Sequence, residues 1–324
     1  MHTMRQIANY RIIKLLSRGG FGDVHLARPI GERRRVAIKV LRLPEDDNLD
    51  RFYREAKLLH RQMDNRFIVD LLDWDLEHEP PFLAMEYCDG GSLRAWVEER
   101  RDWREVVVAL IHAASGLQGI HQRGGFHRDL KPDNLLLATT PDGNKIIKIG
   151  DFGLARIPLP GGSRMTLSAC GTKGYMAPEV QAGASYSRKA DIFSLGITGL
   201  EFLTGSTNAA YWQSVPGPPE LRRLLQSMVN VNPTRRPSID QVRARLLALQ
   251  QEIMQRSRTA ATVPVKQPET RKSTGSGWGG MLLGGLGLAA AALGVAAVAK
   301  SSRKRSWDPT VQRYRGPDGR FRKG

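Results

Sequence analysis

The sequence predicts an α+β chain with two lobes, a small strand-rich lobe followed by a larger helical lobe. Short runs of apolar and β-branched residues, separated by turn residues, fill residues 8–86, and such runs are typical of strands. From residue 92 onward, apolar residues recur at helical spacing over longer segments. Because the turn Asp89-Gly90-Gly91 separates the two patterns, we expect a hinge at residues 86–91.

Composition excludes several classes of protein. Residues 256–324 contain 14 Lys/Arg and 3 Asp/Glu, so most of the net charge of +17 belongs to the tail and a nucleic-acid-binding core is not indicated. Two cysteines, Cys88 and Cys170, cannot form a disulfide framework, and we expect thiols in a reducing compartment. Charged residues interrupt residues 1–20, so no secretory signal is predicted and residues 1–255 should be cytoplasmic.

The first lobe begins with two predicted strands, residues 10–16 and 24–27, around a glycine-rich turn. The backbone N–H groups of such a turn can approach phosphate oxygens, although most glycine-rich turns are only turns. The predicted strand 36–40 carries a single lysine, Lys39, and the predicted helix 50–60 carries Glu55. An ion pair between these two side chains is one interpretation; two solvated charges are the other.

Hydrophobic periodicity and helix-capping residues predict two further strands and four helices. Strands are expected at 68–76 and 81–87, a helix capped by Ser92 through Val97, a helix from the capping box Asp102/Glu105 to His121, a helix 192–203 capped by Asp191 and stopped by Gly205, and a last helix from the capping box Ser238/Gln241 through Ile253.

The stretch from residue 127 to residue 153 holds three acid or amide side chains on loops, Asp129, Asn134 and Asp151. The apolar runs 135–137 and 146–149 flank a turn at 141–144, which predicts a β-hairpin. A hairpin can bring Asn134 close to Asp151, and Mg²⁺ takes oxygen ligands. The spacing therefore predicts a metal site without saying what the metal does.

Taken together, these stretches resemble the eukaryotic-type (Hanks-type) serine/threonine protein kinase family over residues 8–255. The segments that carry the resemblance occur in the order and spacing of that family. They are Gly19, Gly22 and Val24, then Val36-Ala37-Ile38-Lys39, Glu55, His127-Arg128-Asp129 with Asn134, Asp151-Phe152-Gly153, Ala177-Pro178-Glu179, Asp191 and Arg236. The resemblance implies the two-lobed protein-kinase fold, with an N-lobe at about 8–86 and a C-lobe at about 92–255.

The resemblance also implies a function, transfer of phosphate from ATP with Mg²⁺ to protein substrates, and a role for each site residue. Lys39, held by Glu55, would pair with phosphates; Asp129 would orient the attacking hydroxyl and accept its proton; Lys131 would face the transferred phosphate. Asn134 and Asp151 would hold Mg²⁺. Met85 would be the gatekeeper of the adenine pocket. The nucleotide-binding set implied is Leu16, Gly19, Gly22, Val24, Ala37, Lys39, Met85, Glu86, Cys88 and Leu136.

Two departures from the family pattern are visible. Ser17 stands where the family has the first loop glycine, and we expect little loss of nucleotide affinity from it. Residues 205–220 are shorter than is usual, with a Pro/Gly-rich loop at 215–219 in place of an extra helix. The shortening puts family-like substrate docking on that face in doubt.

The resemblance also implies regulation, because an arginine beside the base candidate, here Arg128 beside Asp129, marks the subclass of the family that commonly uses phosphorylation of the activation loop. A phosphate on Ser163, Thr166 or Ser168 could pair with Arg128 and order that segment, with Thr166 the best single candidate. Ordinary loop hydroxyls are the alternative.

The tail divides into a linker at 256–278, an apolar segment at 279–299 and a basic end at 300–324. The apolar segment has 21 residues without a charged or polar side chain, and as a helix it would span about 31 Å, close to the thickness of a bilayer core. We therefore expect a single-pass transmembrane helix and membrane association. A Gly/Ala-rich helix that packs on protein is the alternative, and Gly280 with Gly284 fits self-association.

The charge of the basic end opposes that topology. Residues 300–324 contain nine Lys/Arg, which the positive-inside tendency would keep in the cytoplasm. The end could cross nevertheless, or the segment could lie on the membrane, or helices could associate without spanning. Two competing functions also stay open: a pseudokinase-like scaffold that binds without transfer, and a membrane-anchored interaction module.

Overall fold

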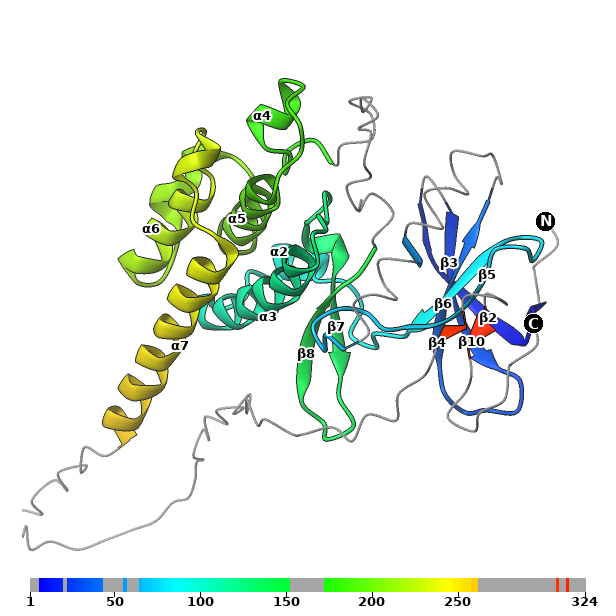
Figure 1. The fold of residues 1–324 in the computed structure, drawn as a ribbon. Helices are drawn as coiled ribbons and strands as arrows, with labels where there is room; N and C mark the ends of the chain where they lie inside the picture. Colours follow the sequence, from blue (N-terminus) through cyan, green and yellow to red (C-terminus); the bar gives the residue numbers. More distant parts are fainter. Residues whose placement is uncertain are drawn as a thin grey trace, which may run out of the picture.

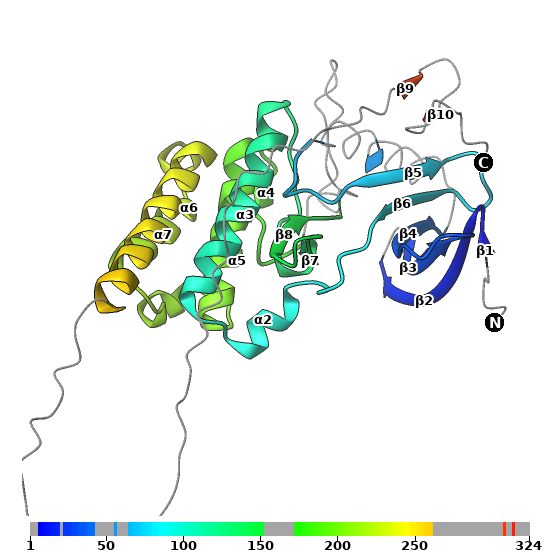
Figure 2. The same cartoon turned by 90° about the horizontal axis from the view of Figure 1, so that it is seen from below.

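In the computed structural model, the described residues are 6–19, 22–42, 55–56, 64–151, 172–261, 307–308 and 313–314. A twisted sheet forms one lobe and a group of helices the other, with the hairpin β7–β8 between them (Figures 1 and 2). The two-lobed α+β architecture predicted from the sequence is confirmed for these residues.

The N-lobe is built on a six-stranded antiparallel sheet in the order β1-β2-β3-β4-β6-β5. Its strands are β1 Gln6–Ile7, β2 Tyr10–Arg18, β3 Gly22–Pro29, β4 Val36–Leu41, β5 Leu71–Asp75 and β6 Phe82–Glu86. Alternation along β4 sends Val36, Ile38 and Val40 to one face, where they pack in an apolar cluster with Tyr10 and Phe82. Lys39 therefore lies on the opposite face, toward the helical lobe.

The C-lobe packs its helices around α3, which lies against α5 and α7. The elements are α2 Arg94–Glu99, α3 Trp103–Gln122, η1 Pro132–Asn134, β7 Leu135–Thr139, β8 Lys145–Ile149, α4 Pro178–Gln181, α5 Arg188–Thr204, η3 Ala209–Ser214, α6 Pro219–Met228, η4 Pro233–Arg235 and α7 Ile239–Ala261. The predicted hairpin is confirmed, with Leu136 paired to Lys148 and Leu137 to Ile147.

Two predicted helix ends are confirmed by their side chains. The Asp102 carboxylate accepts a hydrogen bond from the Arg104 N–H at the start of α3. At α7, Gln241 N–H donates to the Ser238 hydroxyl while the Gln241 side chain accepts from the Ser238 N–H, which is the reciprocal capping box.

Two other predicted caps were wrong. The N-cap of α2 is Leu93, and the Ser92 hydroxyl accepts only a long, 3.4 Å bond from the Arg94 N–H. The N-cap of α5 is Ser187, so the helix begins a turn earlier than expected and Asp191 lies inside it, completely buried. A fully buried carboxylate needs partners, and the partners of Asp191, described below, include the backbone of residues 127 and 128.

The shortened segment after α5 keeps more helix than the sequence predicted. The loop ends at Pro219, which is already the first residue of α6, and Leu221, Leu224, Leu225 and Met228 are buried along one face of this helix. That spacing of apolar residues was the available signal.

Among the described residues, no helix combines the length and apolar character that crossing a bilayer requires. The expected transmembrane segment 279–299 lies outside the described residues. Of the basic end, only β9 Trp307–Asp308 and β10 Arg313–Tyr314 are described, and they pair antiparallel.

Candidate functional site

Lys39 joins three separate parts of the chain. Its ammonium donates to both oxygens of Glu55, at 2.9 and 2.7 Å, and to Oδ1 of Asp151 at 2.8 Å. Burial alone would lower the pKa of Lys39, but the charges of Asp151 and Glu55 outweigh it and raise that pKa. The amine is therefore charged and fixed between strand β4, the helical backbone at Glu55 and the end of β8.

The side chains implied for the adenine pocket share one face of the sheet. Val24 on β3 is paired with Lys39 on β4, and Ala37, two residues before Lys39, is paired with Met85 on β6. Residues directly opposite each other in antiparallel strands project to the same side, as do residues two apart. Met85 is buried, whereas Val24 and Ala37 are half-buried and can line a pocket.

The hinge is tied to β7 by backbone hydrogen bonds. Gly90 N–H donates to Leu137 O at 2.9 Å, and Leu137 N–H donates to Gly91 O at 2.8 Å. Leu136 is consequently held beneath the hinge, and a Cβ at Gly150 would lie 2.9 Å from its Cδ1, so a larger residue at position 150 would require the Leu136 side chain to shift. These bonds place Leu136 next to the hinge, so both can line the same side of the implied adenine pocket.

Two hinge residues of the implied set are buried in different ways. Glu86 receives the Lys148 ammonium through a short contact and the Asp70 N–H at 3.3 Å. Burial, together with the charge of Glu86, raises the pKa of the Cys88 thiol to about 12. Cys88 is thus a neutral thiol at pH 7.

The glycine-rich turn is tight where it is described. Gly19 N–H donates to Gly22 O at 2.9 Å, and a Cβ on Gly22 would lie only 2.2 Å from Val40 O. A side chain at residue 22 is therefore excluded, which is a packing reason for that glycine. Leu16 is 39% exposed at the end of β2, and Ser17 is paired with Val24.

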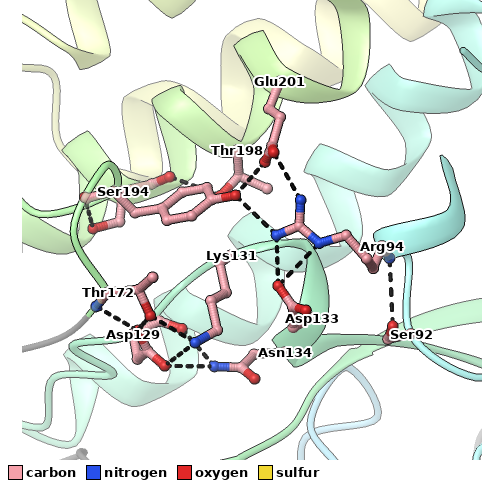
Figure 3. Close-up of polar contacts among 11 residues, drawn as sticks. Ser92, Arg94, Asp129, Lys131, Asp133, Asn134, Thr172, Ser194, Thr198 and Glu201 are labelled. Atoms are coloured by element: carbon pink, nitrogen blue, oxygen red, sulfur yellow. Dashed lines mark hydrogen bonds and ion pairs between the residues drawn. The ribbon is translucent and has the colours of Figure 1, made fainter. Parts of the chain in front are cut away.

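Asp129 is held by donors on both of its oxygens (Figure 3). Thr172 donates to Oδ1 through its N–H at 3.0 Å and its hydroxyl at 2.8 Å. Lys131 contacts Oδ2 at 2.8 Å, and Asn134 Nδ2 donates to the same oxygen at 3.1 Å. Lys131 also donates to the Thr172 hydroxyl at 2.6 Å. Asp129, Lys131, Asn134 and Thr172 therefore form one hydrogen-bonded group.

Asp191 is the anchor beneath this group. Its two carboxylate oxygens accept from the backbone N–H groups of His127 and Arg128 at 3.0 and 2.9 Å, and they contact His121 Nε2 and the Tyr186 hydroxyl. Burial would raise the pKa of Asp191, but the His121 hydrogen bond and charge lower it. The residue expected as a helix cap instead fixes the backbone that presents Asp129.

The residues present fit a hard divalent cation. The Asn134 amide donates through Nδ2 to Asp129, so the side-chain oxygen is the acceptor that is turned away from that bond. Asp151 follows the chain segment bound to Asn134, since Gly150 N–H donates to Asn134 O at 2.9 Å, and its carboxylate is half-exposed. Two oxygen ligands, completed by phosphate oxygens, are how Mg²⁺ is commonly held.

The predicted regulatory residues divide into two groups. Ser163, Thr166 and Ser168 lie outside the described residues. Arg128 is buried, with its guanidinium 5.7 Å from the Phe126 ring centroid and 5.2 Å from that of Tyr186. Its backbone has φ +74°, a left-handed conformation that the Asp191 bonds hold in place.

One arginine of the site was not anticipated from the sequence. Arg94, at the start of α2, donates to Asp133, Glu201 and the Tyr175 hydroxyl, within the group drawn in Figure 3. No local spacing points to this cluster, because its members lie on four segments far apart in the sequence. Arg236 and Glu179, both among the residues that carry the family resemblance, pair through two bonds of 2.7 Å.

Comparison with known proteins gives a consistent result. The protein kinase domain model matches residues 10–246. The chain is 35% identical over 206 residues to the serine/threonine-protein kinase Pkn1 of Myxococcus xanthus, covering 61% of this chain and 29% of the relative. It is also 35% identical to the probable serine/threonine-protein kinase PkwA of Thermomonospora curvata, covering 74% and 34%, and to PknB of Mycobacterium tuberculosis, covering 60% and 32%. The matched region thus spans about a third of each relative.

Proposed function

Because the chain belongs to the protein kinase family, we propose that it transfers the terminal phosphoryl group of ATP to serine or threonine hydroxyls of proteins. The resemblance to eukaryotic-type serine/threonine kinases is confirmed by the family model and the relatives, which also support this enzyme class. The observation that carries the proposal is Lys39, whose ammonium bridges Glu55 and Asp151. A scaffold that does not transfer phosphate has no need to hold these three charges together.

On the nucleotide side, the chain supplies position and charge. Lys39 is placed to pair with phosphate oxygens, and the backbone N–H groups near Gly19 and Gly22 lie at the end of the β2–β3 hairpin, which would cover them. The base would lie between Val24 and Ala37 on one side and Leu136 on the other, with Met85 at the back. Mg²⁺, held by Asn134 and Asp151, would neutralise the charge that develops on the phosphates.

On the acceptor side, Asp129 orients the substrate hydroxyl and accepts its proton. The hydroxyl must displace a donor, and the Thr172 hydroxyl at 2.8 Å shows that the carboxylate already accepts an alcohol in that direction. Lys131 contacts both Asp129 and Thr172, so its ammonium would stabilise negative charge on the transferred phosphoryl group.

The competing function is a pseudokinase-like scaffold, and an activity assay separates the two. The full chain is incubated with radiolabelled ATP and Mg²⁺, alone and with a generic protein substrate, beside Asp129→Ala and the exposed-turn control Asp142→Ala. We expect incorporation by wild type and by Asp142→Ala, with a loss of at least about 100-fold in Asp129→Ala. Equal incorporation in wild type and Asp129→Ala would sink the enzyme proposal.

Control by phosphorylation belongs to the proposal as well. Arg128 would pair with a phosphate on Ser163, Thr166 or Ser168 and so order the activation loop. Mass spectrometry of the chain after incubation with ATP is expected to find phosphate on residues 163–168. A fully active chain that carries none would remove this part of the proposal.

Membrane tethering through residues 279–299 is supported by composition alone, 21 residues without a charged or polar side chain. We expect the full chain in the membrane fraction of expressing cells and a chain lacking 279–299 in the supernatant. A full chain that is found in the supernatant contradicts the tether and leaves the enzyme proposal untouched.

A further inference from the structure

The connection between β3 and β4 is short and strongly basic. Residues 28–35 contain four arginines and one glutamate, a net charge of +3. On the neighbouring strand β2, Arg11 lies directly opposite Arg28. Like charges at directly opposite positions of antiparallel strands repel each other and destabilise the pair of strands. The fold therefore gathers positive charge at this end of the sheet against a local electrostatic penalty.

Three of the arginines at this end of the sheet have no acidic partner. Among the residues that the structure describes, Arg11, Arg28 and Arg33 are exposed and form no ion pair. Arg34 pairs with Glu32 at 3.5 Å, and these two side chains are 49% and 38% exposed. Exposed ion pairs of this kind contribute little free energy, so the positive charge of the surface is available to an anionic partner.

An apolar side chain lies at the tip of the turn. Glu32 N–H donates to Pro29 O at 3.1 Å, which closes a β-turn with Ile30 and Gly31 at its centre, and Gly31 has φ +82°. Ile30 N–H donates to Asn9 O at 2.9 Å, so the turn is fixed beside the start of β2. The Ile30 side chain is 46% exposed. The turn therefore presents an apolar residue to solvent, with arginines before and after it in the chain.

This surface is remote from the candidate catalytic group. Strand β3 begins at Gly22, beside the glycine-rich turn, and ends at Pro29, so the basic turn lies at the opposite end of the strand. Eight residues of strand span about 23 Å. In both views of the molecule, β2 and β3 lie on the side away from helices α5, α6 and α7 (Figures 1 and 2). A partner bound to the turn would leave the glycine-rich turn and the C-lobe uncovered.

A solvated charged turn is the plain alternative, and the combination of arginines with Ile30 favours a different partner. An anionic bilayer attracts arginine side chains near its surface, and its interface accepts an apolar side chain below the level of the headgroups. Arginine also suits lipid phosphate, because its planar fork can bind two phosphate oxygens at once. The surface therefore matches both the charged and the apolar layer of such a bilayer.

We propose that residues 28–35, together with Arg11, form a docking surface for an anionic lipid bilayer. The arginines contact the anionic headgroups, and Ile30 enters the interface between headgroups and acyl chains. The inference goes beyond the proposed kinase function and does not depend on it. It also does not depend on the apolar segment 279–299, because the docking surface is complete within the N-lobe.

Hydrogen exchange of the full chain tests the docking surface locally. In the described part of the chain, the backbone N–H groups of residues 33–35 have no acceptor, so they exchange quickly unless a partner covers them. The chain is mixed with vesicles of phosphatidylcholine, or of phosphatidylcholine containing about 30% phosphatidylglycerol. We expect the charged vesicles to slow exchange in residues 28–35 at least about fivefold relative to the neutral ones. If segment 279–299 inserts, it inserts in both kinds of vesicle, so the comparison isolates the charge of the lipid.

Substitutions identify the residues responsible. Arg28→Gln with Arg33→Gln removes two unpaired charges, each equivalent to about fivefold in affinity for anionic lipid, and should return exchange to within about twofold of its rate with neutral vesicles. Ile30→Ser keeps the charge and should reduce the slowing to about twofold. The matched control is Arg188→Gln with Arg235→Gln, which removes two exposed arginines of the C-lobe and should keep the slowing of wild type.

Three results would overturn the inference. One is equal exchange of residues 28–35 with neutral and charged vesicles. Another is slowing that Arg28→Gln with Arg33→Gln leaves intact, or that the control pair abolishes. The third is slowing by polyglutamate or a DNA duplex, at the same concentration of negative charge, and not by charged vesicles; the surface would then belong to an acidic protein or to nucleic acid. Unchanged exchange in the β7–β8 hairpin checks that each variant is folded.

Discussion

Lys39 and Arg94 each lie between two carboxylates, and the two groups differ in what surrounds them. Lys39 lies between Glu55 and Asp151, with the ammonium and Glu55 almost completely buried. Arg94 lies between Asp133 and Glu201 at a surface that water reaches. The Lys39 ammonium is a compact point charge that is buried, whereas the Arg94 guanidinium is a planar fork that is partly exposed to solvent.

The difference in burial indicates which of the two cations can be removed without leaving a buried, unpaired charge. Removing one partner of a buried pair strands an uncompensated charge, so the Lys39 group is fixed by the fold itself. Removing Arg94 leaves carboxylates that water, or a ligand, can reach. The Lys39 ammonium is therefore confined to one set of partners, whereas the partly exposed Arg94 guanidinium can also contact solvent.

The largest effect is expected at the buried Lys39 group. Lys39→Met should lower kcat/KM at least about 100-fold, because an electrostatic contact to the reacting group is lost. It should also lower the free energy of unfolding by about 3 kcal/mol, since Glu55 is left buried without its cation. Urea unfolding and a transfer assay measure the two effects, with Lys14→Met on the exposed side of β2 as the control. A Lys39→Met chain as stable as wild type would show that burial does not distinguish the two pairs.

Arg236 separates the effect of burial on stability from an effect on catalysis, because it is buried but is not one of the candidate site residues. Its guanidinium is as closed as the Lys39 ammonium, yet its partner Glu179 is in α4, away from Asp129. Arg236→Met should therefore lower the free energy of unfolding by about 3 kcal/mol as well, while kcat/KM at a temperature where the variant is folded falls less than about tenfold. A loss of activity as large as that of Lys39→Met would contradict this separation.

The smallest effect is expected at Asp133, and it depends on pH. Partial burial would raise the pKa of Asp133, but the hydrogen bonds and charge of Arg94 outweigh it and lower that pKa. A carboxyl with a lowered pKa stabilises the folded state above its unfolded pKa, about 3.9, and this contribution is lost as the pH falls through the folded value. Wild type should exceed Asp133→Asn by less than about 1 kcal/mol at pH 7, with the gap closing below about pH 4.

Unfolding by urea at several pH values between 7 and 2.5 measures the gap. The exposed-turn variant Asp142→Ala is not a suitable reference here, because hydrogen bonds to its neighbours also lower the pKa of Asp142. Glu98→Gln, which changes an exposed carboxylate one turn further along α2, serves instead. A gap that stays constant down to pH 2.5 would mean that Arg94 does not stabilise the ionised Asp133.

Local signals in the sequence were enough for much of the fold. The β7–β8 hairpin, the Ser238/Gln241 capping box and the end of α5 at Gly205 each depend on residues a few positions apart, and all three were predicted. The α2 cap was displaced by one residue, the usual precision of such boundaries.

What could not be predicted depends on distant contacts. Local helix-end signals predict Asp191 as a cap, and only the family resemblance singles it out, because its partners His127 and His121 lie 64 and 70 residues earlier. Arg94 went unnoticed because its partners Asp133, Tyr175 and Glu201 lie 39, 81 and 107 residues later. Neither separation has a period, so only the packing of α5 beneath the catalytic loop brings these residues together.

The parallel bridge between Ile68 and Ile149 attaches a segment of the first half of the chain to the helical lobe. Ile149 N–H donates to Phe67 O at 2.8 Å, and Val69 N–H donates to Ile149 O at 3.0 Å, while the Asn65 amide donates to backbone carbonyls of α3. Residues 65–69 are therefore joined to the helical lobe, although they precede β5. These backbone bonds continue into the segment that carries Asp151, two residues after Ile149. We expect them to hold Asp151 at a fixed distance from α3, whatever the orientation of the sheet.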